Sequence, residues 1–331
     1  MGTTPHVLVI GTGSIGERHT RCFLATERVE VSICEINASV RDAVAGRYPL
    51  RGVHADLETA LADRPDIAVI CVPAHLHVAM AIHLLETGVG VLCEKPLSTS
   101  LENIDRLVEL DSSPDARFAM GYVHRAHPLQ TAMRGQLQSG DFGRPLEVIA
   151  QSGQHFPHYR PAYRETYYTD HATGGGAVQD GLTHMVNLVE WHVGPMTRVA
   201  ADCDHLVLEG VSVEDSVHVL ARHGAIMASY TMNQHQAANE TSLTIICERG
   251  TLKVEVHHNR WRSVTGPEQP WSDHEGPPMV RDTVFILQAN AFLDYIAGVA
   301  PPLCTLAEGL QTLRGNLAIL AAADTATWQD V

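Results

Sequence analysis

Short runs of apolar, β-branched residues alternate with longer segments of helical periodicity through the first 122 residues. The helical segments include Ile15–Ala25 and His75–Thr87. This alternation is typical of βαβ units, which build a parallel sheet and bind ligands beyond the carboxyl ends of its strands. The pattern predicts a doubly wound α/β domain over residues 1–122. The runs predicted as strands are His6–Ile10, Val29–Cys34, Ile67–Val72, Val89–Cys93 and Arg117–Tyr122.

The pattern changes after residue 122. Helices are predicted near Pro128–Leu137 and from about Gln179 to Val193, with a long loop at His155–Gly176 before the second. Consecutive short strands joined by tight turns indicate an antiparallel sheet. We therefore expect residues 123–331 to form an α+β domain with a large open, mainly antiparallel sheet. The chain from Phe285 onward is again predicted to be helical, and this domain organisation allows these C-terminal helices to pack back on the first domain. The predicted strands are Leu146–Gly153, Arg198–Val207, Glu214–Ala221, Ile226–Gln234 and Ser242–Cys247.

Charge and cysteine content narrow the class of protein. A net charge of −15 over 331 residues argues against nucleic-acid and membrane partners, because both need a cationic face. The sequence has no evident targeting segment or membrane-spanning run. Seven scattered cysteines without a CxxC pair predict free thiols and a reducing, cytoplasmic location. They are Cys22, Cys34, Cys71, Cys93, Cys203, Cys247 and Cys304.

A glycine-rich loop follows the first predicted strand and opens a helix. Its residues fit the pattern GxGxxG, in which two glycines allow a close approach to a pyrophosphate and the third lets helix and strand pack. The helix N-terminus then offers free N–H groups to the phosphates. A glycine turn without a ligand is the alternative. The loop is Gly11-Thr12-Gly13-Ser14-Ile15-Gly16.

An acidic residue, Glu35, ends the second predicted strand. A carboxylate there accepts hydrogen bonds from the adenosine ribose and repels a 2′-phosphate, so NAD is expected rather than NADP. A solvated acid at a strand end is the alternative. Arg41, about one helical turn further on, is the residue that could support NADP binding.

Three further motifs carry a family resemblance. They are the run from Val72 and Pro73 to His77, the step Glu94-Lys95-Pro96, and the run from Gly174 to His184, which reads GGGAVQDGLTH. Together with the glycine loop they resemble the glucose–fructose oxidoreductase, inositol dehydrogenase and rhizopine-catabolism (Gfo/Idh/MocA) family over essentially the whole chain.

The resemblance implies a Rossmann domain followed by an α+β domain whose open sheet often mediates oligomerisation. A homodimer or homotetramer is therefore expected. It also implies that Val72, Pro73, His77, Glu94 and Lys95 contribute to cofactor binding beside the glycine loop.

Lys95 is one of only two lysines in a chain with 23 basic residues. It follows the carboxyl end of a predicted strand, where its ammonium can donate to a substrate hydroxyl and stabilise alkoxide character. Arginine is bulkier and does not lend a proton, which favours lysine at such a position. A surface lysine is the alternative.

Asp180 and His184 are four residues apart, which on a helix places them on one face. An imidazole is a natural general base for a carbinol proton, and a carboxylate can orient a substrate hydroxyl. The alternative is an acid that serves the helix dipole beside one incidental histidine among 20. The resemblance implies that Lys95, Asp180 and His184 are the catalytic positions. Asn187 departs from the acid found there in many family members.

The loop before the glycines is rich in tyrosine, arginine and histidine. Such side chains suit a polyhydroxylated ligand, and Arg160 and Tyr168 are the candidates for substrate contacts. A loop that packs over the sheet and covers the cofactor is an equal alternative. His155 and His158 have no further ligand at a matching spacing, so no metal site is expected.

These observations predict an NAD-dependent oxidoreductase. It would transfer a hydride between the nicotinamide and a carbinol or ketone carbon of a sugar, sugar derivative or inositol. One alternative is a sugar–sugar oxidoreductase that recycles a tightly bound cofactor. Another is a non-catalytic sugar or dinucleotide sensor on the same fold.

Overall fold

The structure, a computed structural model, describes residues 4–331. The chain divides into two compact units. The first takes in Met1–Ala126 and Val280–Gly309, and the second His127–Met279 and Leu310–Val331. The division therefore falls a few residues after the expected boundary, and one segment near the end of the chain returns to the first unit.

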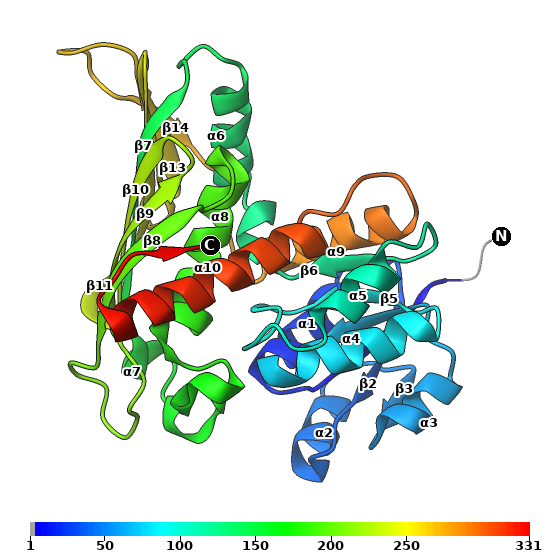
Figure 1. The fold of residues 1–331 in the computed structure, drawn as a ribbon. Helices are drawn as coiled ribbons and strands as arrows, with labels where there is room; N and C mark the ends of the chain where they lie inside the picture. The colour runs from blue at the N-terminus through cyan, green and yellow to red at the C-terminus, as the bar shows by residue number, and fades with distance from the viewer. Residues whose placement is uncertain (1–3) are drawn as a thin grey trace. The chain divides into compact units, whose positions relative to one another are not determined.

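The first unit is built on six parallel strands in the order β3-β2-β1-β4-β5-β6 (Figure 1). The central strands are buried on both faces, which is why their sequences are continuous apolar runs such as HVLVI. The doubly wound sheet is confirmed. Only the three-residue edge strand β3 was not among the predicted runs. The strands are β1 His6–Ile10, β2 Glu30–Cys34, β3 Gly52–His54, β4 Ile67–Ile70, β5 Gly90–Cys93 and β6 Phe118–Met120.

A helix from late in the chain, α9 (Thr283–Ile296), completes this unit. Phe292 and Leu293 are buried in the same core as residues of β1, β2 and β4. Arg21 of α1 also binds Asp282, with 2.5 Å between Nε and Oδ2. Of the helices that follow Phe285, α9 thus belongs to the first unit, whereas most of α10 (Leu306–Thr325) belongs to the second. The other helices are α1 Ser14–Leu24, α2 Ala38–Ala45, α3 Leu57–Ala62, α4 His77–Glu86 and α5 Ile104–Asp111.

The second unit is built on nine strands in the order β14-β13-β12-β11-β7-β10-β9-β8-β15. All neighbours run antiparallel except β7 and β10, so the expected mainly antiparallel sheet is confirmed. Each strand predicted for this domain is present. The strands are β7 Pro145–His155, β8 Arg198–Asp204, β9 Ser216–His223, β10 Ile226–Asn233, β11 His235–Cys247, β12 Gly250–Glu255, β13 Arg260–Val264, β14 Ser272–Glu275 and β15 Gln329–Asp330.

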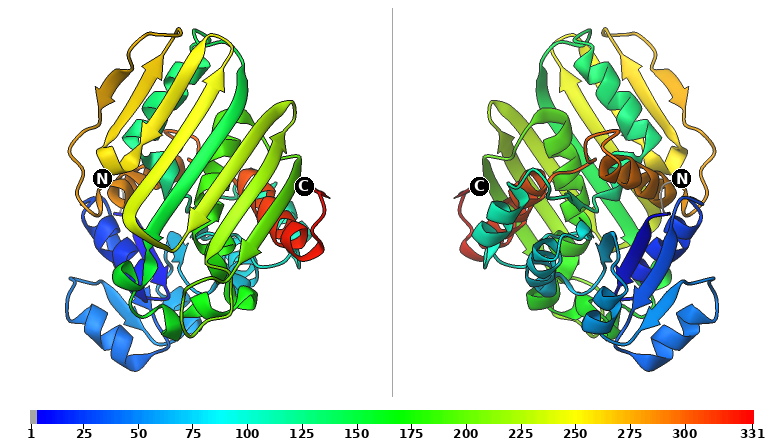
Figure 2. Two further views of the ribbon diagram at one scale, coloured as in Figure 1. Left: turned by 90° about the vertical axis from the view of Figure 1, so that its left-hand side faces the viewer. Right: turned by 90° about the vertical axis from the view of Figure 1, so that its right-hand side faces the viewer.

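One face of this sheet packs against helices. They are α6 (Pro128–Gln138), α8 (Thr183–Val193) and α10 (Leu306–Thr325), whose first turn belongs to the first unit. The core includes Val186 from α8, Ile319 from α10 and Tyr230 from the sheet. The left view of Figure 2 looks onto the opposite face, with these helices behind the strands. We call this opposite face the outer face. None of the helices in the described part of the chain is long and apolar enough to cross a membrane.

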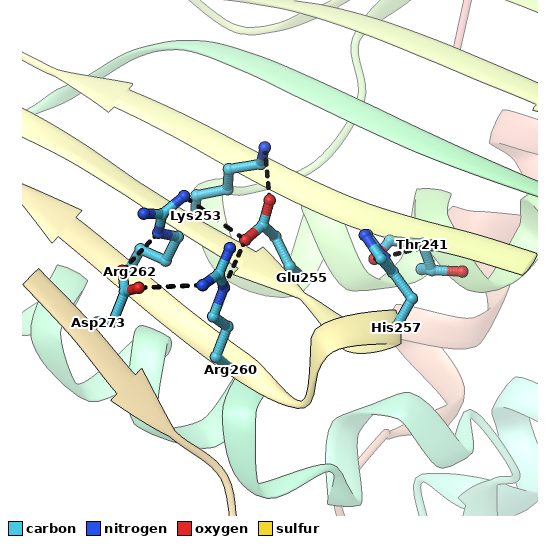
Figure 3. Close-up of polar contacts among 7 residues, drawn as sticks. All are labelled: Thr241, Lys253, Glu255, His257, Arg260, Arg262 and Asp273. Atoms are coloured by element: carbon cyan, nitrogen blue, oxygen red, sulfur yellow. Dashed lines mark hydrogen bonds and ion pairs between the residues drawn. The ribbon is translucent and has the colours of Figure 1, made fainter. Parts of the chain in front are cut away.

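Charged side chains cover the outer face at the β12–β14 edge (Figure 3). Glu255 binds Lys253 at 3.0 Å and Arg260 at 2.8 Å, and Arg262 binds Asp273 at 2.5 Å. Alternate residues of β12, such as Val254, lie in the core. Sequence reasoning missed β12, β13 and β14 because their outer positions are charged, so that no apolar run marks them. The second lysine of the chain is thus part of an ion-pair cluster, and the rarity of lysine alone does not indicate catalysis.

Candidate active site

The glycine loop has the shape that a pyrophosphate requires. Gly11 adopts a φ of +80°, and a Cβ on Gly16 would lie 1.8 Å from the Gly11 carbonyl oxygen. Gly13 instead faces open space, because a Cβ there would meet no atom within 4 Å. Gly13 is also the N-cap of α1 and offers no side chain to the first N–H groups of that helix. These groups are therefore left for a bound anion, and the loop fits a dinucleotide.

Glu35 is held against this loop. Its Oε2 accepts a hydrogen bond from the Thr12 N–H at 2.7 Å, and its Oε1 accepts one from the Asn37 N–H at 2.8 Å. The Arg41 guanidinium donates to the Glu35 carbonyl oxygen at 2.9 Å. Ile36, the next residue, has 86% of its surface exposed, an unusual state for isoleucine. Sequence reasoning missed Ile36, although its place directly after Glu35 was a usable signal.

Lys95 lies at the same edge of the sheet as the glycine loop. In the parallel sheet Ile10 pairs with Ile70, and Ile70 pairs with Cys93. The segments that follow β1, β4 and β5 therefore leave the sheet side by side. These segments carry the glycine loop, the Val72–Pro73 step and the half-buried Lys95, whose peptide bond to Pro96 is cis.

The His77 ring lies within hydrogen-bonding distance of two of these segments. Its Nδ1 and Nε2 lie 2.8 Å from the carbonyl oxygens of Pro96 and Val72 respectively. Burial lowers the pKa of His77, which favours a neutral ring that donates to one of the two oxygens. The side chain is buried, so any effect on a cofactor acts through the positions of Val72 and Pro96. Its assignment to cofactor binding stays a prediction.

Glu94 is a buried carboxylate directly before Lys95. Its Oε1 lies 2.7 Å from Nε2 of His19 on α1, and its Oε2 accepts the Lys95 N–H at 3.1 Å. Burial raises the pKa of Glu94, but the bond from His19 and the charge of Lys95 outweigh this and lower it. Sequence reasoning assigned Glu94 to the cofactor and missed His19. In the structure Glu94 holds the backbone from which the Lys95 side chain extends, and its assignment to cofactor binding stays a prediction.

Asp180 lies in a π turn, Val178–Leu182, and not in the α-helix that the sequence predicted from about Gln179. The α-helix α8 begins at Thr183. Gly181 allows this wide turn to pack on β10, because a Cβ there would lie 1.9 Å from Cε of Met232. Single π turns within helices occur frequently at functional sites. Asp180 Oδ1 accepts a hydrogen bond from the Tyr167 hydroxyl at 2.8 Å.

His184 is half-buried in the first turn of α8. Asn187, one turn later, is buried and donates to the Thr312 hydroxyl of α10 at 2.9 Å. The departure from the family pattern at Asn187 thus affects the packing of two helices.

The loop between β7 and the glycines contains several short helical turns, of which α7 is Phe156–Tyr159. Tyr168 is 2% exposed and packs against Phe156 with their rings tilted, and its hydroxyl contacts Gln234. Its neighbour Tyr167 is 42% exposed and binds Asp180. Tyr167 therefore contacts Asp180, whereas Tyr168 is buried within the loop, and the assignment of Tyr168 to substrate contacts stays a prediction. Arg160 is exposed just after α7.

No group of three or more His, Cys, Asp or Glu side chains among residues 4–331 is arranged to hold a metal ion. The structure therefore brings together the glycine loop, Glu35, Val72 and Lys95 in the first unit. In the second unit it brings Asp180 together with Tyr167.

Comparison with known proteins gives relatives that act on sugars and cyclitols. An inositol 2-dehydrogenase from Acidothermus cellulolyticus is 30% identical over 188 residues, which are 55% of this chain and 52% of that protein. The chain thus spans about half the length of this curated relative. A levoglucosan dehydrogenase from Pseudarthrobacter phenanthrenivorans is 23% identical and is covered over 98% of both chains.

Solved structures share the fold over the whole chain. A levoglucosan dehydrogenase in complex with NADH and levoglucosan has a TM-score of 0.89 at 19% identity, with 99% of this chain and 100% of that chain covered. The WlbA dehydrogenase from Bordetella pertussis, in complex with NADH and UDP-GlcNAcA, has a TM-score of 0.85 at 23% identity, with 99% and 98% covered.

Two family models match successive parts of the sequence. Residues 6–122 match an oxidoreductase family with an NAD-binding Rossmann fold, and residues 131–253 match the Gfo/Idh/MocA C-terminal domain. The two matches follow one another in the order of the two units and cover most of the chain. The chain belongs to the Gfo/Idh/MocA family of oxidoreductases.

Proposed function

We propose that this protein is an NAD-dependent dehydrogenase that oxidises a carbinol, or reduces the matching ketone, of a sugar, sugar derivative or inositol. The observation that carries the proposal is the position of Lys95, which leaves the sheet at the same edge as the glycine loop, with the segment that follows β4 between them. A flexible ammonium close to a dinucleotide site suits a group that polarises a substrate oxygen. The names of the relatives support the class of substrate.

In the oxidative direction three side chains act on the substrate. Lys95 donates a hydrogen bond to the reacting oxygen and stabilises the negative charge that builds up there. His184 takes the hydroxyl proton, and Asp180 binds a hydroxyl and orients the sugar. The glycine loop and Glu35 would hold NAD⁺, whose nicotinamide would supply the acceptor for the hydride of the carbinol carbon. Lys95 and His184 belong to different units, so their action on one carbinol is itself part of the proposal.

Glu35 is the basis for proposing NAD rather than NADP. Two backbone N–H groups hold its carboxylate beside the glycine loop, so its charge would meet a 2′-phosphate there. Ile36 offers an exposed apolar side chain for the adenine face. Arg41 is already engaged with the Glu35 carbonyl, which weakens it as a phosphate ligand.

A spectrophotometric assay tests the activity. The purified protein is mixed with NAD⁺ and a panel of cyclitols, hexoses and anhydrosugars, and NADH is followed by its absorbance. Turnover with free NAD⁺ supports the dehydrogenase. Conversion of a sugar without net NADH indicates a recycled, tightly bound cofactor. Binding of NADH and sugar without any conversion indicates a sensor.

We also propose that two copies associate through the outer face of the nine-stranded sheet. Ile149 and Leu220 are exposed there on either side of Ser229, and Met227 is exposed next to them on β10. Exposed apolar side chains grouped on one face are typical of protein interfaces. Leu220→Glu should convert the oligomer to a monomer in sedimentation velocity without loss of helicity. An unchanged sedimentation coefficient would contradict this interface.

The cysteines support a reducing location, the cytoplasm. All seven are free, and six of them are buried. Burial raises the pKa of Cys22 to about 12 and that of Cys34 to about 11. Such thiols remain protonated and unreactive at neutral pH.

A further inference from the structure

Glu214 is a buried carboxylate that the proposed chemistry does not use. It lies in the loop just before β9, yet one of its oxygens binds the π turn that bears Asp180 and the other binds the turn that contains His171. Its Oε1 accepts the Val178 N–H at 2.8 Å, and its Oε2 lies 2.5 Å from Nε2 of His171. Its backbone carbonyl also accepts the Ala177 N–H at 3.0 Å. Glu214 therefore holds the start of the π turn by side chain and backbone together.

The glycine before this turn is shaped by the same carboxylate. Gly176 adopts a φ of +85°, and a Cβ there would lie 2.5 Å from Oε2 and 2.6 Å from Oε1 of Glu214. Only glycine leaves room for a carboxylate at this distance. The third glycine of the GGG run thus serves the approach of Glu214, in addition to any approach of a ligand.

His171 connects the other side of the carboxylate to the same turn. Its carbonyl oxygen accepts a hydrogen bond from Gln179 Nε2 at 3.0 Å. The preceding residue, Asp170, accepts the Gly175 N–H at its carbonyl oxygen at 2.8 Å. The turn that contains His171 is therefore fastened to the glycines and to the π turn as well as to Glu214.

The imidazole of His171 is half-exposed, so it can exchange protons with solvent. The hydrogen bond to Glu214 raises the pKa of His171 above its ordinary value of 6.5, although burial acts in the opposite direction. The charged groups that face it are Glu214, Asp170 and Asp324, and all three favour its protonated form. The charge-assisted bond is thus complete at low pH and is lost as pH rises through the raised value.

We propose that Glu214 and His171 are positioning residues that fix the π turn and thereby the placement of Asp180 toward substrate. The pair acts through backbone N–H groups and does not touch substrate. This inference rests on the proposed function, because it assigns to Asp180 the task of orienting a sugar hydroxyl. Loss of the pair should raise the KM for the sugar more than it lowers kcat, and should leave NADH binding unchanged.

Glu214→Gln is the variant that tests the pair. It retains an acceptor for the Val178 N–H but removes the charge, so the fold should survive. Glu209→Gln is the matched control, because Glu209 is an exposed acid of the same loop. Three quantities are measured in both: amide hydrogen exchange at Val178, the titration of His171 by NMR, and the kinetic constants with NADH affinity.

In Glu214→Gln we expect faster exchange at Val178, a His171 titration that moves to lower pH, and a KM about 10-fold higher. The KM of the wild type should also rise with pH through the His171 titration, and this dependence should vanish in the variant. Glu209→Gln should match the wild type throughout.

Unchanged exchange at Val178 together with an unchanged His171 titration in Glu214→Gln would overturn the proposal. So would a variant with equal losses in kcat and NADH affinity, which indicate general damage. The exchange and titration measurements do not need turnover. A wild type without dehydrogenase activity would therefore refute the proposed function, and these two measurements would still show whether Glu214 and His171 fix the π turn.

Discussion

Glu94 in the first unit and Glu214 in the second each bind one histidine and one backbone N–H group beside a proposed catalytic residue. They differ in the histidine. The side chain of His19 is 1% exposed, whereas that of His171 is 46% exposed. They also differ in which backbone N–H group they bind. Glu94 binds the N–H of the next residue, and Glu214 binds the N–H of a residue 36 positions away in the sequence.

This difference indicates two kinds of support. The backbone at Lys95 is fixed by a buried pair between helix α1 and the segment that follows β5, where solvent has little access. The turn at Asp180 is fixed by a loop that solvent reaches. The first arrangement should be costly to break, and the second should be inexpensive to break and sensitive to pH.

The largest effect is expected from His19→Ala. It leaves Glu94 buried without its partner and should destabilise the fold by about 3–5 kcal/mol. His171→Ala should cost about 1 kcal/mol or less, because solvent can take the place of the imidazole. Urea unfolding measures both, with His19→Gln as a control that retains a donor. Equal costs for the two alanine variants would remove the contrast between the two pairs.

The next largest effect is expected on kcat, from the variants of Lys95 and His184. Lys95→Ala and His184→Ala should each lower kcat by roughly 10²-fold or more, with NADH affinity unchanged. Because both residues act on the same hydroxyl group, Lys95 on its oxygen and His184 on its proton, the double variant should lose clearly less than the product of the two factors. Steady-state kinetics between pH 6 and 9 should give a wild-type kcat that rises as the imidazole loses its proton. Near-wild-type turnover of His184→Ala with the same profile excludes His184 as the base.

A third carboxylate, Glu35, lies beside the glycine loop and should affect cofactor selectivity alone. Glu35→Ala should narrow the preference for NADH over NADPH by roughly 10- to 100-fold, the size of a charge-assisted contact. Calorimetry of both nucleotides with both proteins gives the ratio. A wild type that binds NADPH more tightly would contradict the role given to Glu35.

The smallest effect on activity is expected from Glu255, which lies among cations away from both catalytic segments. Burial raises its pKa, but the bonds from Lys253 and Arg260 prevail and lower it from 4.5 to about 2. Its contribution to stability is therefore present above pH 4.5 and is lost as pH falls toward 2. Glu255→Gln should cost about 1 kcal/mol at pH 7, since solvent screens the cluster. Thermal unfolding at pH 3 and pH 7 should give a smaller difference between the proteins at pH 3, with kcat unchanged.

In the first unit, local sequence patterns were sufficient to predict that the glycine loop and Lys95 lie at one edge of the sheet. The glycine loop and Lys95 each follow an apolar run, and parallel strands place such positions at one edge. The partner of Glu94 was not accessible in this way, because His19 meets it only after the helix has packed on the sheet.

The second unit depends more on contacts between distant residues. Whether Tyr167 or Tyr168 faces Asp180 is decided by which ring the hydrophobic cluster around Phe156 accepts. The π turn depends on Glu214 and Met232, which lie on other strands and loops. No periodicity within the helix itself indicates either partner.

The return of α9 to the first unit has a consequence for synthesis on the ribosome. The strands β1, β2 and β4 emerge early, but Phe292 and Leu293, which share their core, emerge only after the whole nine-stranded sheet except β15. The nascent NAD-binding unit therefore keeps an unfilled apolar surface while more than 150 further residues are translated. A chaperone that binds apolar segments would have the most time to bind this surface during that interval. A fragment ending at Ala126 should aggregate unless α9 is supplied in trans.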